Sequence, residues 1–435
     1  MSRVAVVGVG NTPFKARHID KTFQRLAYES VKSALQDAGA ARDDVDSVVY
    51  AIYNDFFERC AMPDLHIHYL LGLARKPALR VTTGGATGGY AMRAAYAEVA
   101  SGLHDVVMVV GVEKVADVAN VMEMIKSITY AADPFFEASL GASPAGSYGG
   151  AILWHMENYG TTEEDMARVV VKNKGNARNN PDAHSPMDIT VADVLASPMV
   201  IYPLKILDHC LNSEGAATVI LANEEAAGRF AGKPVWMTGV GASNESGRQA
   251  ERDDVGDSLF PAVKASADRA YAMAGVSDPA GSIDVAEVYD SFSGVEICLY
   301  EEFGFCGRGE GARFLANGRA SARLQPGEPV GRADRRRARN RRHRGLPGGR
   351  GGQTDKGRGR RQAGGRRQAR ARSEHGGRAG RVLREHRAGG ISNERRPAFQ
   401  TAQRTGRLRD HPRPLEDRLL RLGRRAVAVL PGAQG

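Results

Sequence analysis

The chain has 435 residues, 42% of them hydrophobic, which is enough for two or three domains or for one large two-lobed enzyme. It has no apolar run of about 18 residues and no signal-peptide layout at its N-terminus, so we expect no membrane span and a cytoplasmic protein. The net charge of +10 suggests a nucleic-acid binder, but residues 318–435 hold 32 Arg, one Lys and nine acidic residues. Residues 1–317 keep 27 basic and 41 acidic residues, which is typical of an acidic protein that does not bind nucleic acid.

The first half of the chain alternates between strand-like and helix-like segments. Strands are predicted from short apolar runs, and helices from apolar residues three and four positions apart. In chain order we expect a strand at 4–10, a helix at about 20–38, strands at 45–56 and 78–81, a helix at about 87–101, and strands at 105–112, 199–207 and 216–223. An insertion of about 113–200 interrupts this first half, which we bound at 1–230.

The first half contains the segment RVTTGGATGGYAMRAAYAEVASG at 80–102. A glycine-rich turn opens a helix of small residues, as in the strand-to-helix elbows that present catalytic nucleophiles. The tip carries Gly84 and Gly85 instead of Cys, Ser or Asp. Such an elbow could leave room for substrate and direct backbone N–H groups at it. Alternatively, the glycines serve only close packing of the helix on the strand.

The same order of elements returns later in the chain. VWMTGVGAS at 235–243 predicts a strand, about 257–275 an amphipathic helix, and IDVAEVYDSF at 283–292 a second strand. Strand, helix and strand at similar spacing, twice, indicate a duplicated α/β unit whose second half starts at 231 and is incomplete at 317.

Residues 318–435 form an Arg/Gly-rich segment with three interpretations. It could be a disordered arm that binds RNA, a solvated extension, or the product of out-of-frame translation of GC-rich DNA. Against RNA binding, the segment has one aromatic residue, Phe399, for stacking. The 32-to-1 ratio of Arg to Lys favours the frameshift. Because the second half is incomplete, we expect the chain as written to be unstable or inactive. The coding DNA across residues 310–330 tests this interpretation.

Five stretches of the chain resemble the thiolase superfamily, in its sterol-carrier-protein and lipid-transfer-protein branch. They are AVVGVGNTPF, the elbow with its helix, ENYGTTEEDMARVVVKNKGNARNNP, YPLKILDHCLNSEGAATVIL and AEVYDSFSGVEICLYEEFGFCGRGEG, in family order. The resemblance implies an α/β duplicated thiolase fold with α-β-α-β-α layers. It also implies an acyl-CoA substrate, with coenzyme A as the substrate moiety and no bound cofactor or metal, and a homodimer.

The departures from the family concern its two cysteines. On the match of VTTGGATGG, the nucleophilic Cys of thiolases falls at Gly85, and glycine cannot form a covalent acyl intermediate. The second Cys and the GHP-type motif of the family belong to the second half beyond residue 318, and neither is found in this sequence.

The resemblance makes Tyr289 and Asp290 the candidate catalytic residues. In thiolase-like aldolases a Tyr in a similar YD-x-F setting is implicated as an acid/base, and Tyr289 matches it. A Tyr with its ordinary pKa of about 10 is a poor base at neutral pH unless a cation or hydrogen-bond donors lower that pKa. A half-buried strand residue is the alternative. Asp290 follows on the opposite strand face, where it could orient a neighbour or cap the next helix.

Other histidines and cysteines are weaker candidates. His155 matches a family position near the substrate loop, so we expect it to contact substrate, as we do Gly84 and Gly85. His66 and His68 share a predicted strand face without a third metal ligand. The remaining pair, His209-Cys210, is adjacent and should face opposite ways.

Three functions fit these residues. The first is a lyase that cleaves a β-hydroxyacyl-CoA by a retro-aldol reaction, on a branched or aromatic acyl group. The second is an acyltransferase subunit in which free CoA attacks a β-ketoacyl-CoA directly, so turnover would depend on CoA. The third is a non-catalytic thiolase-like scaffold. Related proteins of the branch work with a small partner carrying a zinc ribbon and an OB-fold, and we expect such a partner here.

Overall fold

The computed structural model describes residues 2–118, 120–248, 251, 258–320 and 426–429. The chain divides into two units, one of Met1–Glu328 with Arg413–Gly435 and one of Pro329–Pro412, and the described residues belong to the first. The interpretations of the Arg/Gly-rich segment therefore fall almost entirely outside the described residues.

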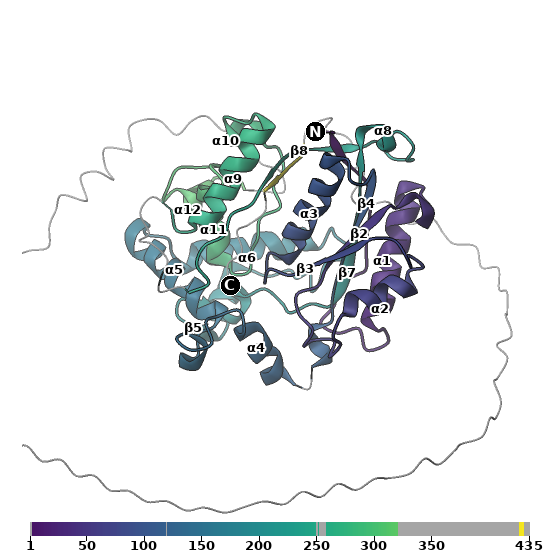
Figure 1. The fold of residues 1–435 in the computed structure, drawn as a ribbon. Helices are drawn as coiled ribbons and strands as arrows, with labels where there is room; N and C mark the ends of the chain where they lie inside the picture. The colour runs from purple at the N-terminus through teal and green to yellow at the C-terminus, as the bar shows by residue number, and fades with distance from the viewer. Residues whose placement is uncertain (1, 119, 249–250, 252–257, 321–425, 430–435) are drawn as a thin grey trace, which may run out of the picture. The chain divides into compact units, whose positions relative to one another are not determined.

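A seven-stranded mixed sheet, in the order β3-β2-β4-β7-β1-β8-β9, organises the first unit (Figure 1). Its strands are β1 (Val4–Asn11), β2 (Ser47–Ala51), β3 (Ala78–Val81), β4 (Val106–Glu113), β7 (Gly215–Asn223), β8 (Val235–Gly241) and β9 (Ala426–Val429). Strand β2 is parallel to β3 and β4, whereas β7 runs antiparallel to both β4 and β1. The predicted strands of the first half are confirmed, apart from 199–207, which forms the separate hairpin of β5 (Met199–Ile201) and β6 (Leu204–Lys205).

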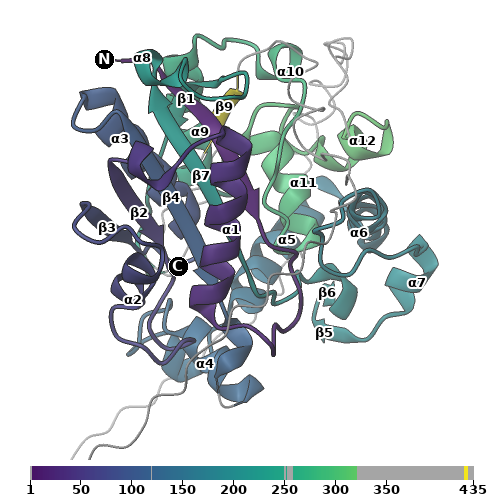
Figure 2. The same cartoon turned by 90° about the vertical axis from the view of Figure 1, so that its right-hand side faces the viewer.

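Helices cover both faces of the sheet. The described helices are α1 (Phe23–Ala38), α2 (Pro63–Leu70), α3 (Thr87–Ser101), α4 (Val121–Thr129), α5 (Pro144–Tyr159), α6 (Glu163–Ala177), α7 (Val191–Ala196), α8 (Glu224–Ala227), α9 (Pro261–Ala274), α10 (Pro279–Ser282), α11 (Ser293–Glu302) and α12 (Gly311–Ala316). Helices α1 and α3 lie on opposite faces (Figures 1 and 2), because Val48 and Tyr50 of β2 pack toward α1 while Val49 packs toward α3. Within the described residues no helix is long and apolar enough to cross a membrane.

Two glycines, one in each copy of the duplicated unit, lie where a helix packs closely on a strand. A Cβ added to Gly10 of β1 would lie 2.3 Å from the backbone nitrogen of Ala34 in α1. A Cβ added to Gly241 of β8 would lie 1.9 Å from the carbonyl oxygen of Ser266 in α9. In both copies, therefore, a helix backbone approaches the strand so closely that only glycine fits.

Two predicted strands are wrong. The segment 283–292 has extended dihedral angles at its two ends, Ile283 and Phe292, but among the described residues its only bridge is the isolated one from Phe292 to His209. The segment DLHIHYL belongs to helix α2, which begins at Pro63, a residue favoured in the first turn of a helix. The alternation of His66 and His68 with apolar residues therefore did not indicate a strand.

A second hydrophobic core surrounds α11. Every residue from Ser293 to Tyr300 is buried, because α5, α6, α9 and α12 surround this helix. The helix therefore shows no polar face, and it fixes the extended segment that precedes it.

Candidate active site

A cavity of about 1250 Å³ opens where the elbow, the ends of β2 and β4, the start of α5 and the extended segment meet. The predicted residues Gly84, Gly85 and Tyr289 all line it. Its other lining residues include Tyr53, Glu113, Tyr148, Glu245, Ser246 and Glu251. The elbow glycines and Tyr289, some 200 positions apart in the sequence, therefore line the same cavity.

The elbow has two glycines with different requirements. Gly84 has a φ of +61°, a left-handed conformation that L side chains rarely adopt. The turn is locked by Thr87, whose Oγ1 donates to the Gly84 carbonyl at 2.7 Å and accepts from the Thr83 N–H at 2.9 Å. The N–H groups of Ala86 and Thr87 donate inside the turn, at 3.4 and 3.2 Å. These two donors are therefore engaged and do not form a free clamp.

Gly85 faces the cavity. A Cβ at Gly85 would lie 3.8 Å from the hydroxyl oxygen of Tyr289, and within the described residues no other atom beyond its chain neighbours lies within 4 Å of it. Close helix–strand packing therefore does not require this glycine, in contrast to Gly10 and Gly241. The space left by its missing side chain lies directly beside the Tyr289 phenol.

Tyr289 keeps its proton at neutral pH, because its pKa is raised. Its side chain is 46% exposed because it lines the cavity, yet the surrounding protein removes much of its bulk water. That burial raises the pKa of Tyr289 above its ordinary value, and the neighbouring Cys210 and Asp290 raise it further. The predicted base would need a lowered pKa, so the structure favours the phenol as a hydrogen-bond donor instead.

Asp290 points away from Tyr289, as expected for neighbours on an extended segment. It lines a separate cavity of about 220 Å³ with His209 and Cys210. Its Oδ2 accepts from Asn173 Nδ2 at 2.7 Å, and it does not cap α11, whose N-cap residue is Phe292. Burial first, and then the Glu296 carboxylate, raise the pKa of Asp290. The two candidate catalytic residues are therefore not brought together.

His155 does not contact the cavity. It is buried in α5, where Nδ1 lies 2.9 Å from Thr161 Oγ1 and Nε2 lies 3.1 Å from Glu301 Oε1. Nε2 thus joins α5 to α11, and Nδ1 joins α5 to the turn before α6, so the expected substrate contact is corrected to a structural one. His68 is likewise structural, with its Nδ1 3.0 Å from the Tyr50 hydroxyl.

The sequence did not single out Glu113 and Tyr53. Glu113 ends β4, and its Oε1 accepts from the backbone N–H of Tyr53 in the loop after β2. The Tyr53 ring lies 4.0 Å from the Cβ position of Gly84, so these residues form a continuous wall from the elbow to β4. The available signal was a carboxylate at the carboxyl end of a buried strand, where ligands bind in open α/β sheets.

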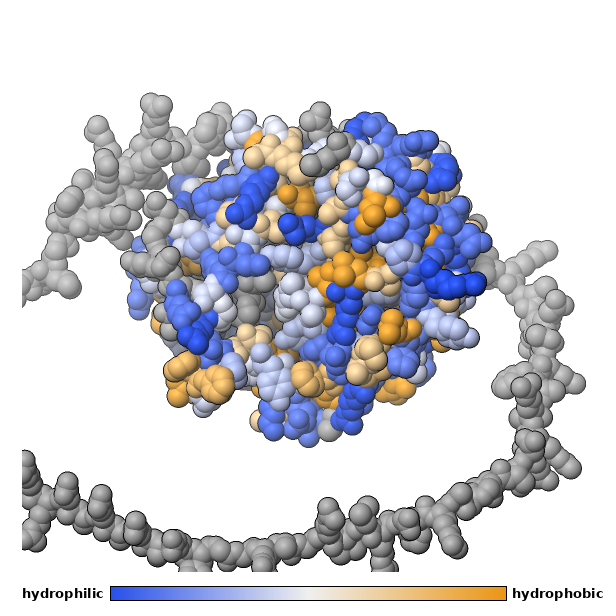
Figure 3. Space-filling model, in the orientation of Figure 1, coloured by the Kyte–Doolittle hydropathy of each residue, from blue (hydrophilic) through white to orange (hydrophobic). Residues whose placement is uncertain are grey.

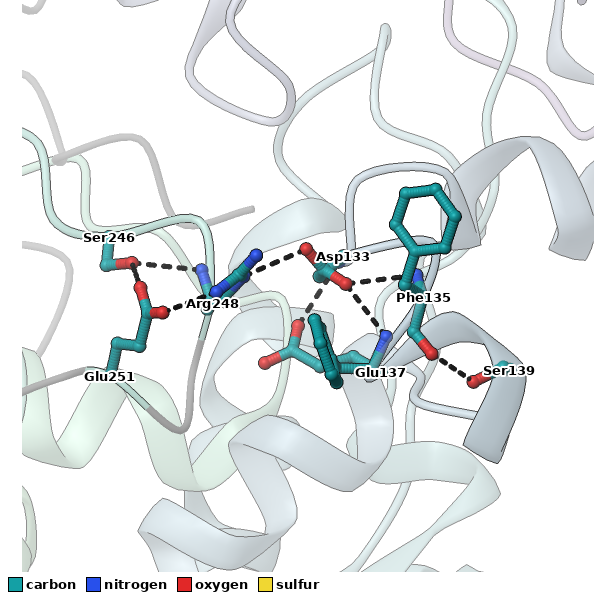
Figure 4. A network of polar contacts seen from close by, with 8 residues as sticks. Asp133, Phe135, Glu137, Ser139, Ser246, Arg248 and Glu251 are labelled. Atoms are coloured by element: carbon teal, nitrogen blue, oxygen red, sulfur yellow. Dashed lines mark hydrogen bonds and ion pairs between the residues drawn. The ribbon is translucent and has the colours of Figure 1, made fainter.

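A polar network links two segments at the cavity (Figure 4). Arg248 Nε lies 3.0 Å from Asp133 Oδ2, and Arg248 Nη1 lies 2.6 Å from Glu251 Oε1. The guanidinium also lies 5.0 Å from the ring centre of Phe136. Backbone N–H donation from Phe136 is the first cause that lowers the pKa of Asp133. Because the network is exposed, it positions these segments more than it stabilises the fold.

Comparison with known proteins identifies the family. Residues 4–192 match the family model of the thiolase N-terminal domain, and residues 241–325 match that of the thiolase C-terminal domain-like family. Over 322 residues the chain is 36% identical to an acetyl-CoA acetyltransferase of Methanothermobacter thermautotrophicus, which covers 73% of this chain and 81% of that protein. The chain belongs to the thiolase family.

The expected branch of the family is confirmed by two further similarities. Sterol carrier protein 2 of Bos taurus is 29% identical over 334 residues, covering 73% of this chain and 59% of that protein. The solved structure of the Ltp2-ChsH2(DUF35) aldolase is 26% identical, with a TM-score of 0.63, and covers 73% of this chain and 81% of that chain. The thiolase fold predicted from the sequence is thereby confirmed.

Proposed function

We propose that this thiolase-family protein cleaves or forms a carbon–carbon bond in an acyl-CoA thioester without a cysteine nucleophile, by a retro-aldol reaction. The observation that carries the proposal is the Gly85 position, which opens onto the cavity 3.8 Å from the Tyr289 hydroxyl. A glycine offers no nucleophile, whereas a phenol that keeps its proton can stabilise an oxyanion. The similarity to a solved aldolase structure supports the same reaction class.

The reaction suits these groups. In a retro-aldol cleavage the β-hydroxyl loses its proton, the bond between the α- and β-carbons breaks, and its electron pair moves into a thioester enolate. The raised pKa of Tyr289 keeps its proton on the phenol, which donates a hydrogen bond to the negative oxygen of the enolate. A cavity of about 1250 Å³ is large enough for a bulky acyl group together with part of the CoA thioester.

The test uses 3-hydroxy-3-phenylpropanoyl-CoA, which a retro-aldolase splits into benzaldehyde and acetyl-CoA. We expect Tyr289→Phe to lower kcat by about 10²- to 10³-fold, the usual effect of removing one oxyanion donor. Tyr202→Phe, at an exposed tyrosine outside the cavity lining, is the matched control and should leave kcat unchanged. Failure of the wild-type chain to release benzaldehyde would refute the retro-aldol proposal.

Direct thiolysis is the second candidate, favoured by the 36% identity to an acetyl-CoA acetyltransferase. Here free CoA would attack 3-oxo-3-phenylpropanoyl-CoA to give benzoyl-CoA and acetyl-CoA. Turnover of this substrate that depends on added CoA, without cleavage of the hydroxy substrate, would replace the lyase with the acyltransferase.

We also propose a homodimer and a small zinc-ribbon/OB-fold partner subunit, in the cytoplasm. Strand β3 is an edge of the sheet, with Leu79 47% exposed, and Tyr69 of the adjacent α2 is 80% exposed. Hydrophobic residues gather on this face (Figure 3), and an open strand edge beside them suits pairing with a second copy.

The named second component of the related aldolase supports the proposed partner subunit. Sedimentation of the chain alone and with a candidate subunit tests both proposals.

A further inference from the structure

The proposed cleavage requires a base for the β-hydroxyl proton, and Tyr289 cannot supply it at neutral pH because its pKa is raised. Among the described residues, three carboxylates line the cavity. Glu245 accepts from the Ala262 N–H at 2.7 Å, and Glu251 is paired with Arg248. Glu113, at the end of β4, differs from both, because one of its carboxylate oxygens is buried without a hydrogen-bond partner among the described residues.

One carboxylate oxygen of Glu113 is held and the other is not. Its Oε1 accepts from the Tyr53 N–H, while its Oε2 is buried and has no hydrogen-bond partner within the part of the chain that the structure describes. The Tyr53 ring joins this carboxylate to the elbow at Gly84, and Gly85 adjoins the Tyr289 phenol. The carboxylate and the phenol are therefore both part of the wall that the elbow organises. A buried carboxylate oxygen without a partner is costly to keep unless it has a use.

A second glutamate controls the proton on the first. Glu58 accepts from the Lys114 N–H at 3.1 Å, and its Oε2 is also buried without a partner. Burial, followed by the charge of Glu58, raises the pKa of Glu113 well above its ordinary value. Burial likewise raises the pKa of Glu58 to about 7. The charge of Glu58 therefore adds to burial in favouring a proton on Glu113, and we call these two glutamates the proton-sharing pair.

The neighbouring charges do not neutralise the pair. Arg80 lowers the pKa of both glutamates, but its Nη1 lies 2.6 Å from Asp55 and 3.8 Å from Asp64. Asp117 raises the pKa of Glu58 further. The remaining group facing Glu113, Tyr53, is a phenol whose own pKa is raised by burial and by Glu113. Lys114 directs its Nζ away, to backbone oxygens of His18 and Lys21.

We infer that Glu113 is the general base of the carbon–carbon cleavage, with Glu58 as the positioning residue that sets its proton affinity. The inference rests on the proposed retro-aldol function. The Glu113 carboxylate takes the β-hydroxyl proton as the carbonyl forms and the bond between the α- and β-carbons breaks. The electron pair becomes the thioester enolate, which takes up a proton at its α-carbon. Glu113 then releases the proton it gained, so charge and atoms balance over the cycle.

The pH dependence follows from the ionised form being active. Cleavage should increase as pH rises through the pKa of Glu113, because protonated Glu113 cannot accept the hydroxyl proton. Glu58→Gln removes a like charge, so the pKa of Glu113 should fall. The acid limb, which is the rise of kcat/KM with increasing pH, should then move to lower pH. A glutamate with only a structural role would not move that limb.

The experiment compares the full-length wild type with Glu113→Gln, Glu58→Gln and, as control, Glu157→Gln, an exposed glutamate of α5. The probe is 3-hydroxy-3-phenylpropanoyl-CoA, and affinity for the product acetyl-CoA is measured by calorimetry. We expect Glu113→Gln to lower kcat by about 10²- to 10⁴-fold, the usual range for a general base, with unchanged acetyl-CoA affinity. Infrared difference spectra of the same variants report loss of a protonated carboxyl band without needing turnover.

The outcomes separate the two proposals. Wild-type cleavage with Glu113→Gln active within threefold would overturn the role of Glu113 while leaving the retro-aldol function intact. Absence of cleavage by the wild type would refute the retro-aldol function, and with it this role. An unshifted acid limb in Glu58→Gln, or an infrared spectrum in which Glu113→Gln loses no protonated carboxyl band near neutral pH, would overturn the proton-sharing pair.

Discussion

Gly85→Ala separates the role of the open elbow in catalysis from its role in folding. A Cβ at this position meets the Tyr289 hydroxyl oxygen at 3.8 Å, an ordinary van der Waals distance. The Gly85 backbone is not left-handed, so alanine adopts it without strain. We therefore expect the free energy of unfolding to change by less than about 0.5 kcal/mol. Gly84→Ala, with its φ of +61°, should instead cost about 1–2 kcal/mol.

The catalytic effect of Gly85→Ala should be much larger than its effect on stability. A substrate oxygen bonded to Tyr289 would lie about 2.8 Å from the hydroxyl, in the space that the new methyl group enters. A displacement of about 1 Å would lower kcat/KM by roughly 10²-fold. Urea unfolding and the benzaldehyde assay measure the two quantities on the same preparation. Wild-type kcat/KM in a stably folded Gly85→Ala would refute the placement of the reacting oxygen beside Tyr289.

Three further predictions concern the surrounding structure. His155→Leu should lower the free energy of unfolding by about 2 kcal/mol, measured with urea, because Glu301 loses a buried hydrogen-bond partner. The KM of this variant should stay unchanged, and a raised KM would show that His155 contacts substrate. Gly241→Ala should cost about 3 kcal/mol, because its Cβ would lie 1.9 Å from the Ser266 oxygen; an unchanged melting temperature would contradict the close approach of α9. The pKa of Glu58 is raised from 4.5 to about 7, so the fold loses stability as pH rises across that interval. Glu58→Gln should therefore be more stable than the wild type by about 3 kcal/mol at pH 8 but not at pH 4, and equal gains at both pH values would contradict the shift.

Local signals predicted the first half well. The helix expected at about 87–101 is observed at Thr87–Ser101, because Gly102 ends it in a left-handed conformation, as Gly39 ends α1. The segment 283–292 shows the limit of such signals. Its alternation correctly predicts extended backbone and opposite directions for Tyr289 and Asp290, but a strand also needs neighbours, which the local sequence does not specify.

The site itself was only partly predictable. The family resemblance brought Gly85 and Tyr289 to attention, and the structure places them in one cavity. Glu113 was missed because a carboxylate at the end of a strand is ordinarily solvated. Its importance comes from Tyr53 and Glu58, which the loop after β2 brings beside it and which no spacing in the sequence relates to it.

The segment that carries Tyr289 depends on the other half of the chain for its position. The Cys210 N–H donates to the Ser291 carbonyl at 2.9 Å, and Asn173 holds Asp290. The later copy of the duplicated unit thus supplies the phenol, while the earlier copy supplies the elbow and the contacts that aim the phenol at it. The cavity wall is thus divided between the two copies, so removing either copy would take away one side of the cavity.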